Sequence, residues 1–238
     1  MEKIISPENI RQFAYINDKI VKTPIKGIVM EFFGLGSQNI YDEELDMGKF
    51  FAEHNLLYVI PYSNPWAWMN SKNISFIDEV IDALIEKYDL RDDIPIVHIG
   101  GSMGGHASIM YTRYSKRKPV ACLANCPVCD LELHFGERFD LPRTLYSAFY
   151  EDGKDFYEEL RKNSPTHIAE MLPDIPYYIF HCCEDKAVNK EIHSDVFVKK
   201  LKLTHAVTYH EVPGKGHCDL TEQMWEVYKN YVVEAVKK

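Results

Sequence analysis

Long apolar runs are missing from this chain. No stretch of its 238 residues approaches the roughly 18 uncharged apolar residues that a membrane-spanning helix needs. Residues 1–17 hold neither an apolar segment nor a small-residue cleavage site, so we expect no secretory signal. Basic charge is also scarce, because 27 Lys and Arg oppose 36 Asp and Glu for a formal net charge of −9. We therefore expect neither nucleic acid nor a membrane as a partner.

Cysteine is too sparse and too clustered to form a disulfide framework in a chain of this length. The cysteines are Cys122, Cys126, Cys129, Cys182, Cys183 and Cys218. Cys126 and Cys129 have CxxC spacing, but no second CxxC completes a zinc site. This favours ordinary reduced thiols over a metal or redox role, and it predicts a cytoplasmic location.

Internal repeats and Gly/Ser linkers are absent too, whereas the 46% apolar content is typical of a globular domain. A chain of this size buries about 70–75% of its unfolded surface, which is enough for one large core. We therefore expect a single domain over residues 1–238.

Short apolar runs alternate with helical patterns, which predicts an α/β fold with a mostly parallel central sheet and helices on both faces. The predicted strands are Gly27–Phe33, Leu56–Ile60, Ile94–Gly100, Val120–Ala124, Tyr177–Cys182 and His205–Val212. The predicted helices are Asp42–Glu53, Ile74–Tyr88, Met103–Tyr114, Asn189–Leu203 and Thr221–Val236. Residues 130–172 contain no strong strand and many aromatic residues, so we expect a small helical insertion, or lid, there.

The run Gly100-Gly101-Ser102-Met103-Gly104 is a G-x-S-x-G motif between a predicted buried strand and a predicted helix. In this setting the serine stands at the apex of a tight turn, where its hydroxyl is exposed and a helix N-terminus faces any anion formed there. The alternative is a Gly-rich turn with a capping serine. The context favours Ser102 as a nucleophile.

A serine nucleophile needs a histidine base and a carboxylate that orients the base, in the chain order Ser, Asp or Glu, His. His217 follows the last predicted strand in a short glycine-containing loop, so it is the candidate base rather than a surface histidine. The segment after Tyr177–Cys182 offers Glu184 and Asp185 as candidate acids. We discount a metal site in this segment, because neighbouring strand residues point to opposite faces.

An acyl-transfer site also needs N–H donors for the oxyanion. One candidate is the backbone N–H of Met103, directly after the nucleophile. The second comes from the glycine-containing loop after the first predicted strand, with Leu35 preferred over Phe33 or Gly34. The alternative is a plain Gly-rich strand exit.

With these residues in order, the chain resembles an α/β-hydrolase, and more closely the catalytic domain of the prolyl oligopeptidase family and its stand-alone esterase relatives. The resemblance begins near Gly27 and rests on four segments. These are Gly100–Gly105, Asn163–Ile168 ahead of Ile175–His181, Asp185–Val188 and Gly216-His217. It implies the α/β-hydrolase fold and, through the D-x-x-V pattern, Asp185 rather than Glu184 as the acid.

Two departures from the family bear on function. Phe33-Gly34 stands where the family has His-Gly, and 238 residues leave no room for the propeller of the peptidases. The resemblance therefore implies a serine hydrolase that cleaves a small carboxylic ester without a cofactor. A peptidase, an acyltransferase with the same triad, and a non-catalytic binding protein of this fold are the alternatives.

Two tryptophans, Trp66 and Trp68, follow the second predicted strand. They stand at the carboxyl edge of the sheet, where α/β proteins bind ligands, so they fit a substrate pocket. Packing of the insertion on the body explains them equally well.

Overall fold

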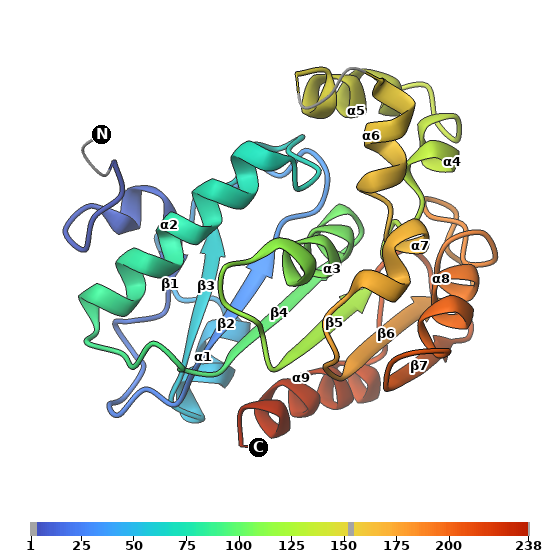
Figure 1. Cartoon of the computed structure of the whole chain (residues 1–238). Helices are drawn as coiled ribbons and strands as arrows, with labels where there is room; N and C mark the ends of the chain where they lie inside the picture. The colour runs from blue at the N-terminus through green and yellow to red at the C-terminus, as the bar shows by residue number, and fades with distance from the viewer. Residues whose placement is uncertain (1–3, 152–154, 238) are drawn as a thin grey trace.

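The computed structural model describes residues 4–151 and 155–237, within which seven strands form one sheet in the order β1-β3-β2-β4-β5-β6-β7. All neighbouring pairs are parallel except β1 with β3. The strands are β1 Ala14–Ile16, β2 Gly27–Phe32, β3 Leu56–Pro61, β4 Ile96–Gly101, β5 Ala121–Asn125, β6 Tyr177–Cys182 and β7 Val207–Val212. Figure 1 shows the carboxyl ends of the parallel strands facing one side of the molecule.

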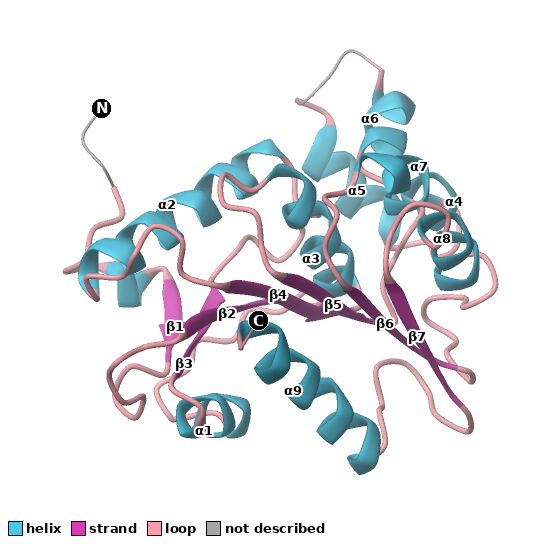
Figure 2. Ribbon diagram, turned by 60° about the horizontal axis from the view of Figure 1, so that its bottom comes forward, coloured by secondary structure: helices cyan, strands magenta, loops and turns pink. Residues whose placement is uncertain are grey.

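Helices cover both faces of the sheet (Figure 2), as the alternating sequence pattern predicts. The helices are α1 Asp46–Glu53, α2 Ser71–Lys87, α3 Met103–Tyr114, α4 Leu131–Phe135, α5 Leu141–Phe149, α6 Phe156–Lys162, α7 Pro165–Ile168, α8 Ser194–Leu201 and α9 Glu222–Val236, with short 3-10 turns at Ile10–Gln12 and Ala169–Met171. None of these helices is long and apolar enough to span a bilayer.

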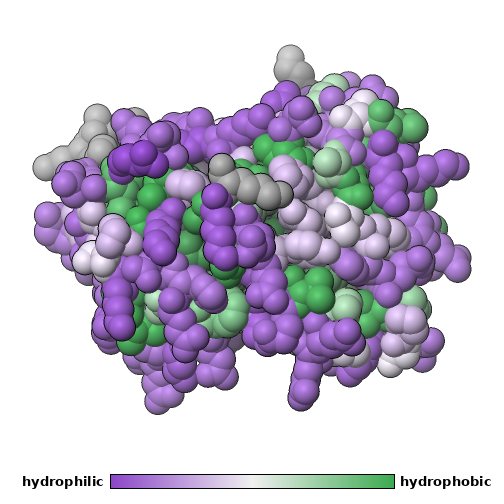
Figure 3. Space-filling view, turned by 90° about the horizontal axis from the view of Figure 1, so that it is seen from below, coloured by the Kyte–Doolittle hydropathy of each residue, from purple (hydrophilic) through white to green (hydrophobic). Residues whose placement is uncertain are grey.

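Two apolar clusters fill the space between sheet and helices. Met30 and Phe32 of β2 belong to the cluster under α2, α3 and α8, whereas Val29 belongs to the cluster under α1 and α9. This alternation is the ordinary consequence of a pleated strand, whose successive side chains point to opposite faces. It places the side chain of Glu31 on the α1 and α9 face. The outer surface in Figure 3 is largely hydrophilic, with apolar side chains in separate patches.

Residues 130–172 contain α4 to α7, which lie beyond the carboxyl ends of the strands (Figure 1). A third apolar cluster joins this segment to the body through Trp68 and Met103. Hydrogen bonds add to it: the carboxylate of Asp130 accepts from two N–H groups at the start of α4, and His193 links Glu137 to the backbone of Cys129. The segment is therefore packed on the sheet edge rather than extended into solvent.

Several boundaries differ from the sequence predictions. The short strand β1 is not predicted, and β4, β5 and β7 begin one or two residues after the predicted runs. Helix α8 begins at Ser194 rather than at Asn189, because the preceding residues form turns, and α2 begins at Ser71, where Asn70 caps it. The α/β architecture itself is confirmed.

Candidate active site

Ser102 stands between β4 and α3 with φ 59° and ψ −125°, a conformation in which a residue with a side chain is strained. The turn closes only because its neighbours lack side chains. A Cβ on Gly100 would collide with the carbonyl oxygen of Gly104, and a Cβ on Gly104 would collide with the carbonyl oxygen of Phe32. The G-x-S-x-G motif therefore has a steric cause, and the strain points to a functional turn.

Asp185 and His217 are brought together from two loops that are 32 residues apart. His217 Nδ1 donates to Asp185 Oδ2 at 2.7 Å, and the N–H groups of Ala187 and Val188 donate to Asp185 Oδ1 at 2.8 and 3.0 Å. His181 Nε2 lies 3.3 Å from Asp185 Oδ2 and 3.1 Å from the carbonyl oxygen of Val188, so this nitrogen carries the proton. The carboxylate is thus held by four donors.

These contacts set the protonation of the pair. Burial would raise the pKa of Asp185, but the hydrogen bonds from His181, His217 and Val188 outweigh it and hold this pKa well below its usual range. Burial would likewise lower the pKa of His217, but the hydrogen bond and charge of Asp185 raise it overall. The aspartate is therefore ionised at neutral pH beside a histidine of increased basicity. Glu184, the other candidate acid, is exposed.

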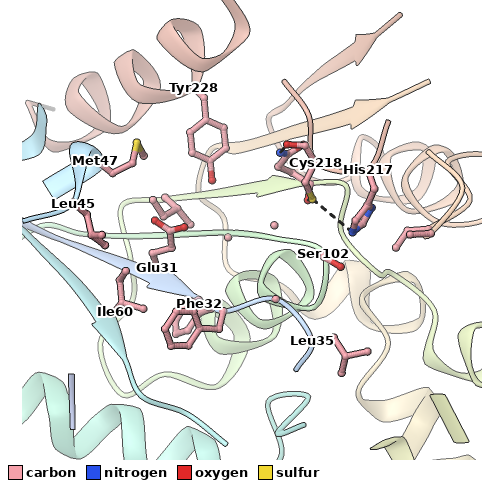
Figure 4. Close-up of a pocket in the computed structure, with 18 of the residues that line it drawn as sticks. Glu31, Phe32, Leu35, Leu45, Met47, Ile60, Ser102, His217, Cys218 and Tyr228 are labelled. Atoms are coloured by element: carbon pink, nitrogen blue, oxygen red, sulfur yellow. Dashed lines mark hydrogen bonds between the residues drawn. The ribbon is translucent and has the colours of Figure 1, made fainter. Parts of the chain in front are cut away.

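Ser102 and His217 line one cavity, at the same end of it in Figure 4. Within the described residues, the Ser102 hydroxyl makes no hydrogen bond to His217. The Nε2 atom of His217 instead lies 3.8 Å from the thiol sulfur of Cys218. Hydrogen bonds between a catalytic serine and its histidine often form only when substrate binds, so the pairing of Ser102 with His217 stays a prediction.

Both predicted oxyanion donors lie close to Ser102 in the fold. Met103 is the first residue of α3, so its N–H belongs to the unsatisfied end of the helix. Leu35 lines the same cavity as Ser102, and its N–H donates to no described residue. The N–H of the next residue, Gly36, is already used, because it donates to the carbonyl oxygen of Pro65 at 3.0 Å.

The cavity has a volume of about 740 Å³, within the range typical of small-molecule sites. Figure 4 shows its lining in two groups. We call the group with Leu35, Ser102 and His217 the Ser102 end, and the group with Glu31, Leu45, Met47, Ile60, Tyr58 and Tyr228 the Glu31 end. Sequence reasoning did not single out Glu31, although a carboxylate inside the apolar run Gly27–Phe33 was a usable signal.

The two tryptophans have different surroundings. The side chain of Trp68 is buried, lines the cavity and donates from Nε1 to the hydroxyl of Thr144 in α5 at 3.1 Å. It therefore joins the helical segment to the body and also meets the cavity. Trp66 lines a different pocket, and the guanidinium of Arg143 lies 4.9 Å from its ring centroid.

All six cysteines are unpaired. Three groups of described residues bring histidine, cysteine or carboxylate ligand atoms within 4.8 Å of one another. They are Cys126, His217 and Cys218; Cys126, His181 and Asp185; and His134, Glu137 and His193. In each group, hydrogen bonds within the protein already engage at least one of the atoms, and we assign no ion to any of them.

Comparisons with known proteins identify the fold. No protein-family model and no curated protein matches the chain. Solved structures do match, among them the acylaminoacyl peptidase of Pyrococcus horikoshii with a TM-score of 0.74 and 15% identity over 94% of this chain. The chain has the α/β-hydrolase fold. This confirms the fold implied by the resemblance.

Other neighbours differ in how much of their own length the chain spans. The S-formylglutathione hydrolase of Agrobacterium tumefaciens matches with a TM-score of 0.71 and 16% identity, covering 94% of this chain and 88% of that one. Puromycin hydrolase matches with a TM-score of 0.66 and 18% identity over 90% of this chain. The chain spans 33% of puromycin hydrolase and 39% of the acylaminoacyl peptidase, less than half of each.

Proposed function

We propose that this protein is a serine hydrolase that cleaves a small carboxylic ester through an acyl-enzyme intermediate. The observation that supports it best is the hydrogen bond between the buried carboxylate of Asp185 and the half-buried His217, which lines one cavity with the strained Ser102. In this role Ser102 is the nucleophile, His217 the base and Asp185 the acid that orients the imidazole.

The reaction would proceed in two halves. The hydroxyl oxygen of Ser102 attacks the ester carbonyl carbon while its proton passes to Nε2 of His217, and the N–H groups of Met103 and Leu35 hold the oxyanion. The C–O bond to the alcohol then breaks, and the alcohol leaves with the proton from His217. A water molecule next gives a proton to His217 and attacks the acyl carbon. The bond from this carbon to the Ser102 oxygen then breaks, the carboxylic acid leaves, and His217 returns the proton to the Ser102 oxygen.

The names of the structural neighbours support a hydrolase, because they include both esterases and peptidases. An ester rather than a peptide fits neighbours that the chain spans almost completely, such as a carbohydrate esterase from gut microbiota at 88% and esterase PE8 at 93%. We further propose that residues 130–172 act as a lid over this cavity, since His134 and Arg138 line it. A cytoplasmic location and a single domain over residues 1–238 stay predictions from the sequence.

The test uses purified protein, 4-nitrophenyl butyrate and a fluorophosphonate probe. We expect ester cleavage and labelling at Ser102, and at least a thousandfold loss of kcat/KM in Ser102→Ala. Ser108→Ala is the matched control, because Ser108 lies on the same helix with its hydroxyl bonded to the carbonyl oxygen of Gly105. Equal turnover by wild type and Ser102→Ala would contradict the proposal. A protein that binds esters but resists the probe would favour the non-catalytic alternative.

Added alcohols or amines distinguish hydrolysis from acyl transfer. If an acceptor such as methanol only adds a minor product, water is the natural acceptor. If it takes most of the acyl group at low concentration, the same residues serve an acyltransferase.

A further inference from the structure

Two carboxyl groups that line the cavity have no part in the proposed reaction. One of them, Asp46 at the start of α1, is exposed and already pairs with Lys49 at 3.0 Å, so the other, Glu31, is the one without a cation among the described residues. Glu31 lies on β2, opposite Ile99 of β4, and points to the α1 and α9 face. Its side chain lines the cavity that also holds Ser102, but among the residues at the opposite end in Figure 4. A carboxylate in this apolar part of the sheet needs an explanation, because the burial of an unpaired charge is costly.

The immediate surroundings of Glu31 are apolar and aromatic. Leu45, Met47 and Ile60 supply apolar side chains, and the ring of Tyr228 stands beside the carboxyl group. The hydroxyl of Tyr58 donates to Glu31 Oε2. Figure 4 shows the hydroxyl of Tyr228, which comes from α9, pointing toward the Glu31 carboxylate. This end of the cavity thus combines a carboxylate with aromatic rings.

No cation of the described protein compensates Glu31. The hydroxyl of Tyr58 is its one hydrogen-bond partner within the described residues, and it belongs to no ion pair there. Burial raises the pKa of Glu31, and the Tyr58 hydrogen bond only partly opposes this. Arg138 is the one lysine or arginine among the described residues that line the cavity, and Asp140 already pairs with it.

A ligand cation would complete this site. An ammonium group beside Glu31 would gain a charge-assisted hydrogen bond or ion pair that the protein does not supply. It would also lie near the hydroxyl oxygens of Tyr58 and Tyr228, which can accept hydrogen bonds from its N–H groups. The net charge of −9 adds a general attraction for cations.

We propose that the Glu31 end of the cavity binds the ammonium group of an ester substrate, so that the protein prefers amine-bearing esters over neutral ones. The inference rests on the proposed ester hydrolysis at Ser102. The cavity of about 740 Å³ reaches both groups, so one elongated molecule would place its ester at Ser102 and its ammonium at Glu31.

Matched esters test the preference. On the acyl side, the 4-nitrophenyl esters of heptanoate, 6-hydroxyhexanoate and 6-aminohexanoate differ only in a terminal methyl, hydroxyl or ammonium group. On the alcohol side, acetylcholine and 3,3-dimethylbutyl acetate differ in charge at nearly equal shape. In at least one series we expect kcat/KM to be tenfold or more higher for the cation than for its methyl counterpart.

Glu31→Gln provides the decisive variant, with Glu43→Gln as a control that removes an exposed carboxylate from a nearby loop. We expect Glu31→Gln to lower the ratio of cationic to neutral kcat/KM at least tenfold. Glu43→Gln should keep the wild-type ratio. An unchanged ratio in Glu31→Gln in both series would overturn the proposal, as would equal losses for the hydroxyl and ammonium esters.

A binding measurement separates this proposal from the hydrolysis itself. Calorimetry on Ser102→Ala compares choline with 3,3-dimethylbutan-1-ol, and needs neither turnover nor a folded Glu31 variant. We expect choline to bind at least tenfold more tightly. Equal affinities would overturn the ammonium site even if Ser102 proves to be the nucleophile. If choline binds more tightly but the probe does not label wild-type protein, the ammonium site is upheld and the proposed reaction is contradicted.

Discussion

Asp185 and Glu31 are both carboxyl groups next to the cavity of Ser102, and their environments are opposite: Glu31 lines the cavity, whereas Asp185 is buried and bonds to His217, which lines it. Asp185 has four donors around it, whereas Glu31 has one hydroxyl partner among the described residues. The pKa of Asp185 is therefore depressed, because its hydrogen bonds outweigh burial, and that of Glu31 is raised, because burial outweighs its single bond. The comparison teaches that the number of donors, and not burial alone, sets the direction in which the pKa of an enclosed carboxyl group moves.

The largest effect, a loss of kcat, should follow from the substitution of Asp185. Asp185→Asn should reduce kcat on the order of 10⁴-fold, because the loss of the carboxylate removes both the orientation and the charge stabilisation of His217. The measurement is 4-nitrophenyl butyrate turnover at saturating substrate. Glu184→Asn is the neighbouring control, and an equal loss in both variants would contradict the assignment of the acid.

The second prediction concerns stability and its dependence on pH. A depressed folded pKa contributes stability above the unfolded pKa that is lost as the pH falls, so Asp185→Asn should be most destabilising near pH 8 and less so near pH 3. A raised folded pKa contributes stability below the unfolded pKa that is lost as the pH rises. Glu31→Gln should therefore stabilise the protein toward pH 8, relative to wild type, by about 1–3 kcal/mol.

Urea unfolding of both variants and wild type at pH 3, 4, 6 and 8 measures these free energies. Opposite slopes of the two difference curves would support the comparison. Parallel slopes would mean that folding shifts the pKa values of the two carboxyl groups in the same direction.

A smaller effect should follow from the single hydrogen bond of Glu31. Tyr58→Phe removes the hydroxyl that lowers the pKa of Glu31, so this pKa should rise further. We expect a loss of about 1 kcal/mol of folding free energy at pH 8, and a smaller loss at pH 4, where the carboxyl group is protonated. Tyr15→Phe, which removes a hydroxyl bonded to Glu44, is the control and should show no such effect on Glu31.

The smallest effect should be seen in the acid limb of the rate profile. Activity needs neutral His217, whose pKa Asp185 raises, so kcat/KM of wild type should fall as the pH drops through a value above the usual 6.5. In Asp185→Asn the titration of His217, followed by NMR, should move to lower pH. A histidine pKa that stays the same in the variant would show that Asp185 does not act on it.

The sequence predicts the fold well because apolar strand runs and helical apolar periodicity alternate along it. Six predicted strands correspond to β2 to β7, while β1, Ala14–Ile16, is too short to show a period. The elbow at Ser102 is predictable for a steric reason, since only glycine fits at positions 100 and 104. Glu31 is not, because a sequence shows a carboxylate in a strand but not whether donors or cations surround it.

Met103 has two separate roles, one for its main chain and one for its side chain, and a single substitution would affect both. Its main chain faces the proposed reaction, and its side chain packs among the apolar residues that join helices α4 to α6 to the sheet. A chimera in which another helical insertion replaces residues 130–172 would need a compatible side chain at position 103 as well. The helical insertion and the turn at Ser102 are therefore coupled through Met103, and a redesign of substrate preference should change them together.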